Sequence, residues 1–97
     1  MTLYILRSEG TGRFYVGASE DPAIRLLQHN SILPNPSRWT RGRGPWRIVY
    51  TCEFDSKTRA LQAEKFVKRM KSRAFIDKLI RGAIDLHSIL ENRLPRD

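Results

Sequence analysis

The stretch RFYVGASEDPAIRLLQHN, residues 13–30, decides the fold of this chain. It begins with strand-forming residues, after which Asp21 suits the N-cap of a helix and Pro22 suits its first position. Residues 2–7 form another run of strand formers, and a short glycine-containing turn separates the two runs. The pattern predicts an antiparallel hairpin that leads directly into a helix.

The predicted hairpin has two different faces, because side chains alternate across a strand. Leu3 and Ile5 share one face of the first strand, and Tyr4 takes the other. In the second strand, Val16 and Tyr15 lie on opposite faces. If the larger apolar set faces the core, the two tyrosines lie together on the second face.

The helix after the hairpin carries apolar residues that are candidates for the core and polar residues that are candidates for a functional site. Ala23, Ile24 and Leu27 are expected to form the stripe that packs on the sheet. Arg25 and His29 are four residues apart (29 − 25), so they lie on one side of the helix.

The rest of the chain predicts a loop, one strand and two helices. Residues 31–45 hold three prolines and two glycines and predict a loop, whose length in so small a domain is uncommon unless it binds something. Alternating apolar residues predict a strand over 46–54, and helical patterns follow over 55–70 and 72–83. The predicted fold class is α+β: a three-stranded antiparallel sheet flanked by helices, in the order β-β-α-β-α-α.

For the last strand and the helix after it, the sequence also predicts which side chains are buried, and it predicts where the domain ends. One face of the strand is expected to carry Trp46, Ile48, Tyr50, Cys52 and Phe54. The helix after it, capped by Asp55 or Ser56, is expected to bury Ala60, Ala63, Val67 and Met70. We assign residues 1–82 to the domain and residues 83–97 to a C-terminal tail that either extends the last helix or frays.

Composition favours a nucleic-acid partner. The chain of 97 residues suits one domain, and 18 Lys and Arg against 10 Asp and Glu give a formal net charge of +8. Such a charge attracts polyanions, although it also serves simply to keep a small protein in solution. The lone Cys52 excludes an internal disulfide and a multi-cysteine zinc site. With no secretory signal and no long apolar run, we expect a cytoplasmic protein without membrane association.

A set of residues stands at the spacings that characterise a known protein family. They are Tyr4 in TLY, Tyr15 and Gly17 in YVG, and Arg25, His29 and Glu64. The tyrosines are 11 residues apart (15 − 4), and the arginine follows 10 residues later (25 − 15). These residues resemble the signature of the GIY-YIG nuclease family, and the loop RWTRGRGPWRIVY resembles its small, stand-alone, excision-nuclease-like members. The resemblance implies the GIY-YIG endonuclease fold over residues 1–82.

The resemblance implies a catalytic role for four of these residues. Tyr15 is the general base or a proton relay, although a free phenol with a pKa of about 10 is a weak base at pH 7. Tyr4 orients the nucleophile, and Arg25 holds the scissile phosphate, which suits its planar, permanently charged fork. His29 accepts a proton near working pH. Taken singly, either tyrosine is also explained by packing, Arg25 by an exposed helix position, and His29 by a structural or an exposed position.

Glu64 has two interpretations. With Lys68 four residues later, it forms an ordinary surface pair. Because it neighbours Ala60 and Val67 in the apolar stripe, an unpaired carboxylate there is costly, and a metal ion would remove that cost. The family resemblance implies that Glu64 is the ligand of Mg²⁺ or Mn²⁺, which one carboxylate, waters and substrate phosphate commonly hold.

Further residues are candidates for contact with nucleic acid, because arginine neutralises phosphate and exposed tryptophan stacks on unpaired bases. The set is Arg38, Trp39, Arg41, Arg43, Arg47, Gly17 and Asn30. Gly17 is expected to end the second strand, where a side chain would block the approach of substrate. Trp46 is expected in the core, and Trp39 is either a stacking platform or a core residue.

The sequence departs from the family pattern at three places. Thr2 replaces the first glycine, and Ala18 and approximately Ile76 stand where some members have a lysine and an asparagine. The primary hypothesis is a divalent-metal-dependent endonuclease that acts on DNA, with structured or damaged DNA as the favoured substrate and RNA left open. The alternative is a non-catalytic nucleic-acid-binding module, or an adaptor for a repair or replication protein, that keeps the fold. No prediction of oligomeric state follows.

Overall fold

Three strands and four helices form within residues 1–92, the part of the chain that this computed structural model describes. In chain order they are β1 (Thr2–Ser8), β2 (Phe14–Ser19), α1 (Pro22–His29), β3 (Trp46–Glu53), α2 (Lys57–Met70), α3 (Arg73–Ile80) and α4 (Leu86–Glu91). The central strand, β1, pairs antiparallel with β2 on one side and with β3 on the other. The predicted α+β class and the predicted order up to α3 are confirmed.

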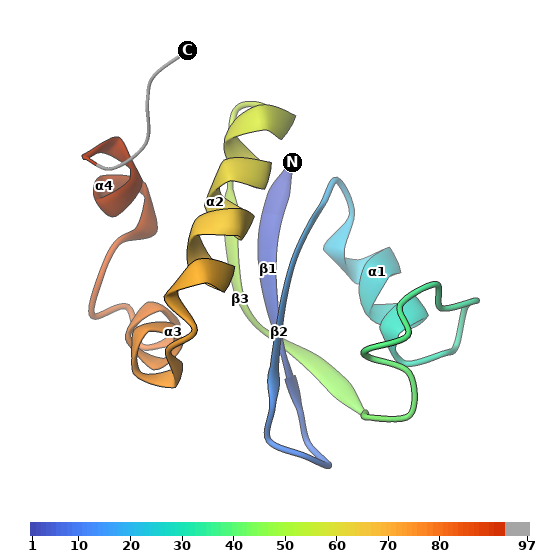
Figure 1. Ribbon diagram of the computed structural model, residues 1–97. Coiled ribbons are helices and arrows are strands. Elements are labelled where there is room, and N and C mark those ends of the chain that lie inside the picture. Colours follow the sequence, from blue (N-terminus) through green and yellow to red (C-terminus); the bar gives the residue numbers. More distant parts are fainter. Residues whose placement is uncertain (93–97) are drawn as a thin grey trace.

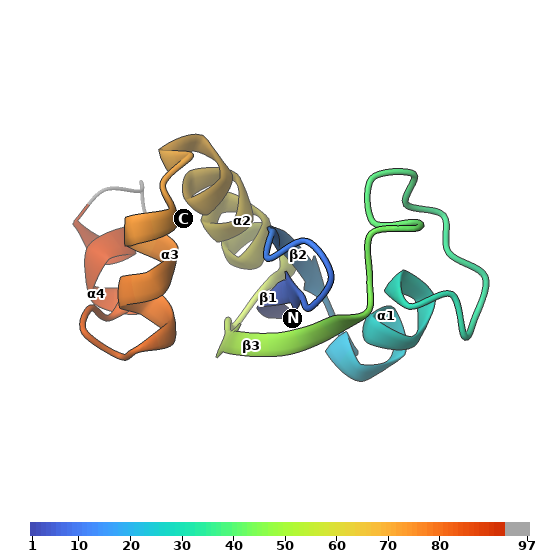
Figure 2. The same ribbon diagram turned by 90° about the horizontal axis from the view of Figure 1, so that it is seen from below.

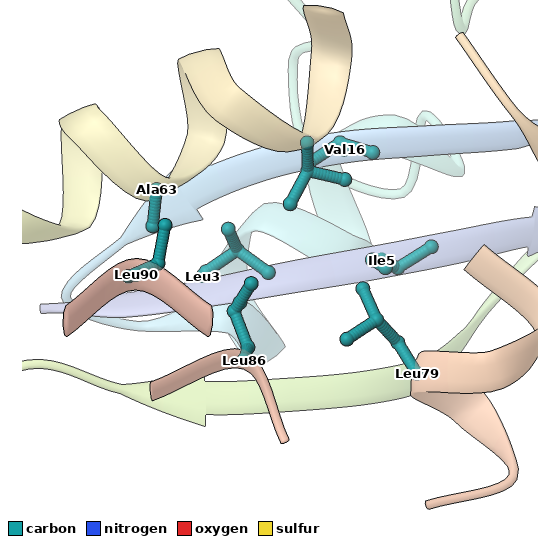
Figure 3. Close-up of a cluster of buried hydrophobic side chains, with 8 residues drawn as sticks. Leu3, Ile5, Val16, Ala63, Leu79, Leu86 and Leu90 are labelled. Atoms are coloured by element: carbon teal, nitrogen blue, oxygen red, sulfur yellow. The ribbon is translucent and has the colours of Figure 1, made fainter. Parts of the chain in front are cut away.

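Helices lie on both faces of the sheet (Figures 1 and 2). The helices α2, α3 and α4 lie on one face, whose buried side chains are drawn in Figure 3. This first cluster consists of Leu3, Ile5, Val16, Ala63, Val67, Leu79, Leu86 and Leu90. The helix α1 lies on the other face, over a second cluster of Tyr4, Leu6 and Trp46 with the partly buried Tyr15, Leu26 and Ile48. Both tyrosines therefore lie on the second face, as alternation predicts.

The strand β3 changes face part of the way along its length. Consecutive residues Ile5 and Leu6 of β1 pair with Tyr50 and Ile48, so β3 contains one extra residue at Val49. A bulge of this kind shifts the side-chain alternation by one position. The prediction that the apolar residues of β3 share one face is therefore wrong. Trp46 and Ile48 belong to the second cluster, whereas Tyr50, Cys52 and Phe54 pack against the first.

The helix α1 packs through a different stripe from the expected one. Leu26 joins the second cluster and His29 is buried, while Ile24 is 43% exposed. The prediction of a packed stripe formed by Ala23, Ile24 and Leu27 is therefore wrong. The helix has only eight residues, and the polar contacts of His29 decide which of its sides faces the sheet.

The helix α2 begins and ends at identifiable signals. Ser56 caps it by accepting a hydrogen bond from the backbone N–H of Arg59, and Lys71 ends it in a left-handed conformation (φ 46°). The predicted burial of Ala60, Ala63 and Val67 is confirmed, but Met70 is exposed, because it lies on the last turn beside this end.

The tail folds back onto the domain. Residues 86–91 form the separate helix α4, and Leu86 and Leu90 point into the first cluster, so the packed core extends past residue 82 (Figure 3). The part of the predicted tail at residues 93–97 lies outside the described residues. No helix within residues 1–92 combines the length and the apolar character needed to cross a bilayer.

Candidate active site

Tyr4 is held in place by the absence of a side chain on the neighbouring strand. It pairs across the sheet with Gly17, and a Cβ atom at Gly17 would lie 2.5 Å from the hydroxyl oxygen of Tyr4 and 2.6 Å from its Cζ atom. The ring of Tyr4 therefore lies directly over the backbone of Gly17. Gly17 lies within β2 and not at its end, so that prediction is wrong. The contact of Gly17 with nucleic acid stays a prediction.

Substituting Gly17 is expected to destabilise the protein. The Gly17→Ala change places a methyl group against a rigid, buried ring, and the free energy of unfolding should fall by about 2 kcal/mol. Urea unfolding measures this change. In a Tyr4→Leu background, where the ring atoms are missing, the same substitution should cost much less. An equal cost in both backgrounds would show that Tyr4 does not set the requirement for glycine.

A hydrogen-bonded chain leads from Tyr4 into the loop before β3. The hydroxyl of Tyr4 lies 2.9 Å from Nε2 of His29, and Nδ1 of His29 lies 2.9 Å from Oγ1 of Thr40. Nδ2 of Asn35 donates to the same Thr40 hydroxyl (3.1 Å), and Nε1 of Trp46 donates to the Thr40 carbonyl (3.0 Å). Because a neutral imidazole has one donor and one acceptor, His29 can accept a proton on one nitrogen while its other nitrogen donates.

Burial and Arg25 set the protonation of this chain. Burial, followed by the positive charge of Arg25, lowers the pKa of His29 to about 4, so the imidazole is neutral at neutral pH. Burial also raises the pKa of Tyr4, and the nearby Arg25 guanidinium opposes this rise. A further hydrogen bond, from Nη1 of Arg25 to Oε1 of Gln28 (2.7 Å), fixes the guanidinium. The result is a protonated phenol beside a neutral base.

Acid is expected to weaken the fold through His29. Because its pKa falls from 6.5 to about 4 on folding, the unfolded chain binds a proton across this pH window that the folded protein does not. The free energy of unfolding should therefore decrease by up to about 3 kcal/mol as the pH drops through the window. Urea unfolding of wild type and of His29→Gln measures this effect.

The His29→Gln variant should lose most of this pH dependence, whereas His87→Gln, which changes an exposed histidine, should keep it. A wild-type protein that is equally stable at both ends of the window would contradict the assignment.

Tyr15 completes the aromatic part of the site. Its ring centroid lies 4.7 Å from that of His29 and 5.7 Å from that of Trp39, and the ammonium of Lys68 lies 5.7 Å from the Tyr15 centroid. The Tyr15 side chain is only partly buried, and its hydroxyl has no hydrogen-bond partner within residues 1–92. The hydroxyl is therefore free to contact water or a substrate.

Glu64, on α2, forms an ion pair with Lys68 and also influences the candidate active site. Its Oε2 atom lies 2.8 Å from Nζ of Lys68, so the ion pair of the first interpretation is present. Its charge nevertheless reaches the site, because it contributes to the raised pKa of Tyr4. Within the described residues no cluster of three metal-ligating side chains exists. A metal ion would thus depend on Glu64, with water and substrate oxygens as the other ligands.

The loop arginines surround an exposed tryptophan. Trp39 is 40% exposed, and its ring lies 5.7 Å from that of Trp46, which is buried as predicted. Nη1 of Arg43 donates to the Trp39 carbonyl (2.6 Å), and its guanidinium lies 5.8 Å from the centroid of the Trp39 ring. Nη2 of Arg41 donates to the carbonyl of Asn35 (2.8 Å). These contacts hold the loop so that Trp39 stands next to Tyr15.

The other candidates for nucleic-acid contact take structural positions or lie apart. The side-chain amide of Asn30 accepts from the backbone N–H of Trp46 (2.6 Å) and donates to its carbonyl (2.9 Å). Arg47 pairs with Glu9 (3.6 Å), on the turn of the hairpin. The Arg38 side chain is exposed, and its carbonyl accepts from the Arg43 side chain. Substrate contact by Asn30, Arg38 and Arg47 stays a prediction.

Sequence reasoning missed two residues of the hydrogen-bonded chain. Thr40 and Asn35 lie in a loop without periodicity, where no pattern distinguishes them from other polar residues. Lys68 was considered only as a partner of Glu64, although it also lies over Tyr15.

The fold and the site together define a class of protein. A small α+β domain here places two phenols, a neutral imidazole, a guanidinium and a carboxylate near one another, a set that can move protons and stabilise negative charge. Residues 1–77 match the model of the GIY-YIG catalytic domain, and the chain belongs to the GIY-YIG nuclease family.

The chain is similar to proteins of two kinds. The chain is 40% identical over 70 residues to a UPF0213 protein of Cupriavidus pinatubonensis, covering 72% of this chain and 74% of that protein. It is also 40% identical over 74 residues to the structure-specific endonuclease subunit SLX1 of Meyerozyma guilliermondii. That match covers 72% of this chain but only 25% of the subunit, so the chain spans about a quarter of that relative's length.

A solved structure supports the fold. The solution NMR structure of a UPF0213 protein from Bacillus halodurans matches with a TM-score of 0.51 and 36% identity. The match covers 82% of this chain and 81% of that protein.

Proposed function

We propose that this protein is a divalent-metal-dependent endonuclease that hydrolyses DNA phosphodiester bonds. The residues proposed to act are Tyr4, Tyr15, Arg25, His29 and Glu64. The observation that carries the proposal is the hydrogen bond between Tyr4 and the neutral His29, beside the free hydroxyl of Tyr15. Membership of the GIY-YIG nuclease family supports it.

Each protein group has a task in the proposed reaction. The Tyr15 oxygen accepts the proton of the attacking water, either as a phenolate or by passing its own proton on, and Tyr4 offers a path inward to Nε2 of His29. As the water oxygen bonds to phosphorus, the bond from phosphorus to the leaving oxygen breaks, and solvent water protonates the leaving oxygen. Arg25, which is held by Gln28, faces the charge that develops on the phosphoryl oxygens. The remaining contact of His29, through Nδ1 to Thr40, keeps the imidazole oriented during the transfer.

Glu64 is the proposed ligand of Mg²⁺ or Mn²⁺. Its Oε1 atom has no partner within residues 1–92, while Oε2 is bound to Lys68, so the carboxylate can accept an ion without losing its place on α2. When bound, such an ion supplies Lewis-acid stabilisation of the phosphoryl oxygens.

Structured or damaged DNA is the proposed substrate class. The net charge of +8 supports binding to nucleic acid in general. The similarity to a protein named structure-specific endonuclease subunit supports a preference for structured DNA and assembly with a partner protein, for which repair or replication is the proposed setting. A cytoplasmic location remains part of this proposal.

A cleavage assay tests the proposal. Purified protein is incubated with supercoiled, single-stranded and branched DNA, in Mg²⁺, in Mn²⁺ and in chelator. Cleavage of at least one substrate should occur with a metal ion and stop in chelator. If no substrate is cut with either ion, the protein is not an endonuclease of this kind.

The second candidate is a nucleic-acid-binding module that keeps the fold without catalysis. The ion pair between Glu64 and Lys68 favours it, because this pair occupies part of the proposed metal ligand. Binding of DNA without cleavage, lost in Arg41→Ala and Arg43→Ala, would support this candidate over the enzyme.

A further inference from the structure

A groove of about 470 Å³ lies beside the outer edge of β2. Tyr15 and Trp39 contribute to its lining, so it is continuous with the candidate active site. The helix α2 packs beside β2 here (Figure 2). Residues at the α2–α3 junction also contribute to the lining. Its apolar lining comes from Phe14, Val16, Val67 and Ile76.

The rim of the groove is cationic. It carries Arg13, Lys68, Lys71 and Arg73, and among the described residues no Asp or Glu lines the groove. Arg13 and Lys71 are exposed, and their side chains have no partner within the described chain, residues 1–92. Arg73 is fixed by a hydrogen bond to the carbonyl of Gly12 (3.0 Å), with its guanidinium 4.7 Å from the centroid of the Phe14 ring. Two cations are therefore free for a ligand.

An apolar floor with a cationic rim selects a particular chemistry. Its ligand carries flat apolar groups linked by negative charges, as a nucleotide strand does. In a duplex the faces of the bases are stacked and hidden, so only an unpaired base can reach the floor. Trp39 is exposed beside the entrance, next to Tyr15, where it offers a stacking surface.

We propose that this groove holds the unpaired strand of a branched or gapped DNA, next to the phosphodiester bond at Tyr15. The assignment rests on the proposed nuclease function and deepens it, because it specifies a substrate in which a single strand meets a duplex. Arg13 and Lys71 bind the phosphates of this strand, and its bases lie against the groove floor and Trp39.

Binding measurements in chelator test the groove independently of cleavage. Fluorescence anisotropy gives the affinity of a labelled oligo-dT and of a blunt duplex with the same number of nucleotides. The groove variant is Arg13→Glu with Lys71→Glu. The matched control is Lys78→Glu with Arg81→Glu, which makes the same change in net charge at exposed positions outside the groove lining.

Wild type should bind oligo-dT more tightly than duplex. The groove variant should lose roughly tenfold or more of its affinity for oligo-dT, while the control loses no more than about threefold. Oligo-dT should also quench the fluorescence of Trp39, and Trp39→Leu should lose this signal. Equal losses in the two double variants, or no preference for oligo-dT over duplex, would overturn the proposal.

Two further ligands test the identity of the occupant. Oligo-U bound more tightly than oligo-dT would contradict the assignment to DNA. An oligo-glutamate peptide bound as tightly as oligo-dT would show that the protein recognises only the negative charge of its ligand. This result would also overturn the assignment.

The groove and the nuclease can fail separately. If wild type binds oligo-dT through Arg13 and Lys71 but cuts no DNA with Mg²⁺ or Mn²⁺, the groove stands and the nuclease proposal falls. If the groove variant cuts branched DNA as fast as wild type, the groove is not part of the substrate site, although the enzyme remains.

Discussion

Replacing Tyr15 by phenylalanine is expected to slow DNA cleavage by about 100- to 10,000-fold, the range typical of a lost acid–base group. The substitution removes only a hydroxyl that has no hydrogen-bond partner within residues 1–92. The ring contacts with His29 and Trp39 remain, so the free energy of unfolding should change by less than about 0.5 kcal/mol. Single-turnover cleavage and urea unfolding measure the two effects.

Tyr50→Phe is the matched control for this prediction. It removes the same atom from a tyrosine that packs against the first cluster, on the opposite face of the sheet. Its cleavage rate should equal that of wild type. A Tyr15→Phe variant that cuts at the wild-type rate would remove Tyr15 from the reaction.

Replacing Glu64 by glutamine should have a comparable effect for a different reason. The substitution keeps the shape of the side chain but removes the charge proposed to hold the metal ion, and cleavage should fall by about a thousandfold. It also releases Lys68 from its ion pair, and a pair of this i, i+4 kind contributes only a few tenths of a kcal/mol. Cleavage rates measured across a range of Mg²⁺ concentrations test this prediction.

The same experiment separates the two interpretations of Glu64. If Glu64 only forms a surface pair, Glu64→Gln cuts DNA normally and loses a trace of stability. Glu53→Gln, at an exposed position on β3, controls for the loss of one negative charge and should leave cleavage unchanged.

The hairpin could be predicted because its faces depend on local alternation. Tyr4 and Tyr15 share a face for the same reason that Leu3 and Ile5 share the other. The bulge at Val49 could not be predicted, since it arises from the pairing of β3 with a strand more than forty residues earlier (49 − 5 = 44). Local periodicity carries no information on such a pairing.

For the helices, the caps could be predicted from neighbouring residues, whereas the buried side of α1 depends on contacts with distant parts of the chain. The caps at Asp21 and Ser56 follow from neighbouring residues and could be predicted. The buried side of α1 depends on the contacts of His29 with Tyr4 and Thr40, which come from β1 and the loop. A stripe of apolar residues was therefore a poor guide for so short and polar a helix.

The candidate site could be predicted as a set of residues but not as a network. The spacing of the signature residues identified Tyr4, Arg25 and His29, which the structure brings together. The contacts that fix them, from Gly17 below Tyr4 and from Thr40 behind His29, depend on three-dimensional packing. The ion pair of Glu64 is one of two alternatives that the sequence allows, and the three-dimensional structure decides in its favour.

The central claim is that Tyr15 and Glu64 act together on one phosphodiester bond. The most direct test is the single-turnover cleavage rate of Tyr15→Phe, of Glu64→Gln and of the double variant, on the same branched DNA with Mg²⁺. When two groups act in the same step, removing the second group after the first has little further effect on the rate. The double variant should therefore cut within about threefold of the slower single variant. Losses that multiply in the double variant, or single variants that cut at the wild-type rate, would contradict the claim.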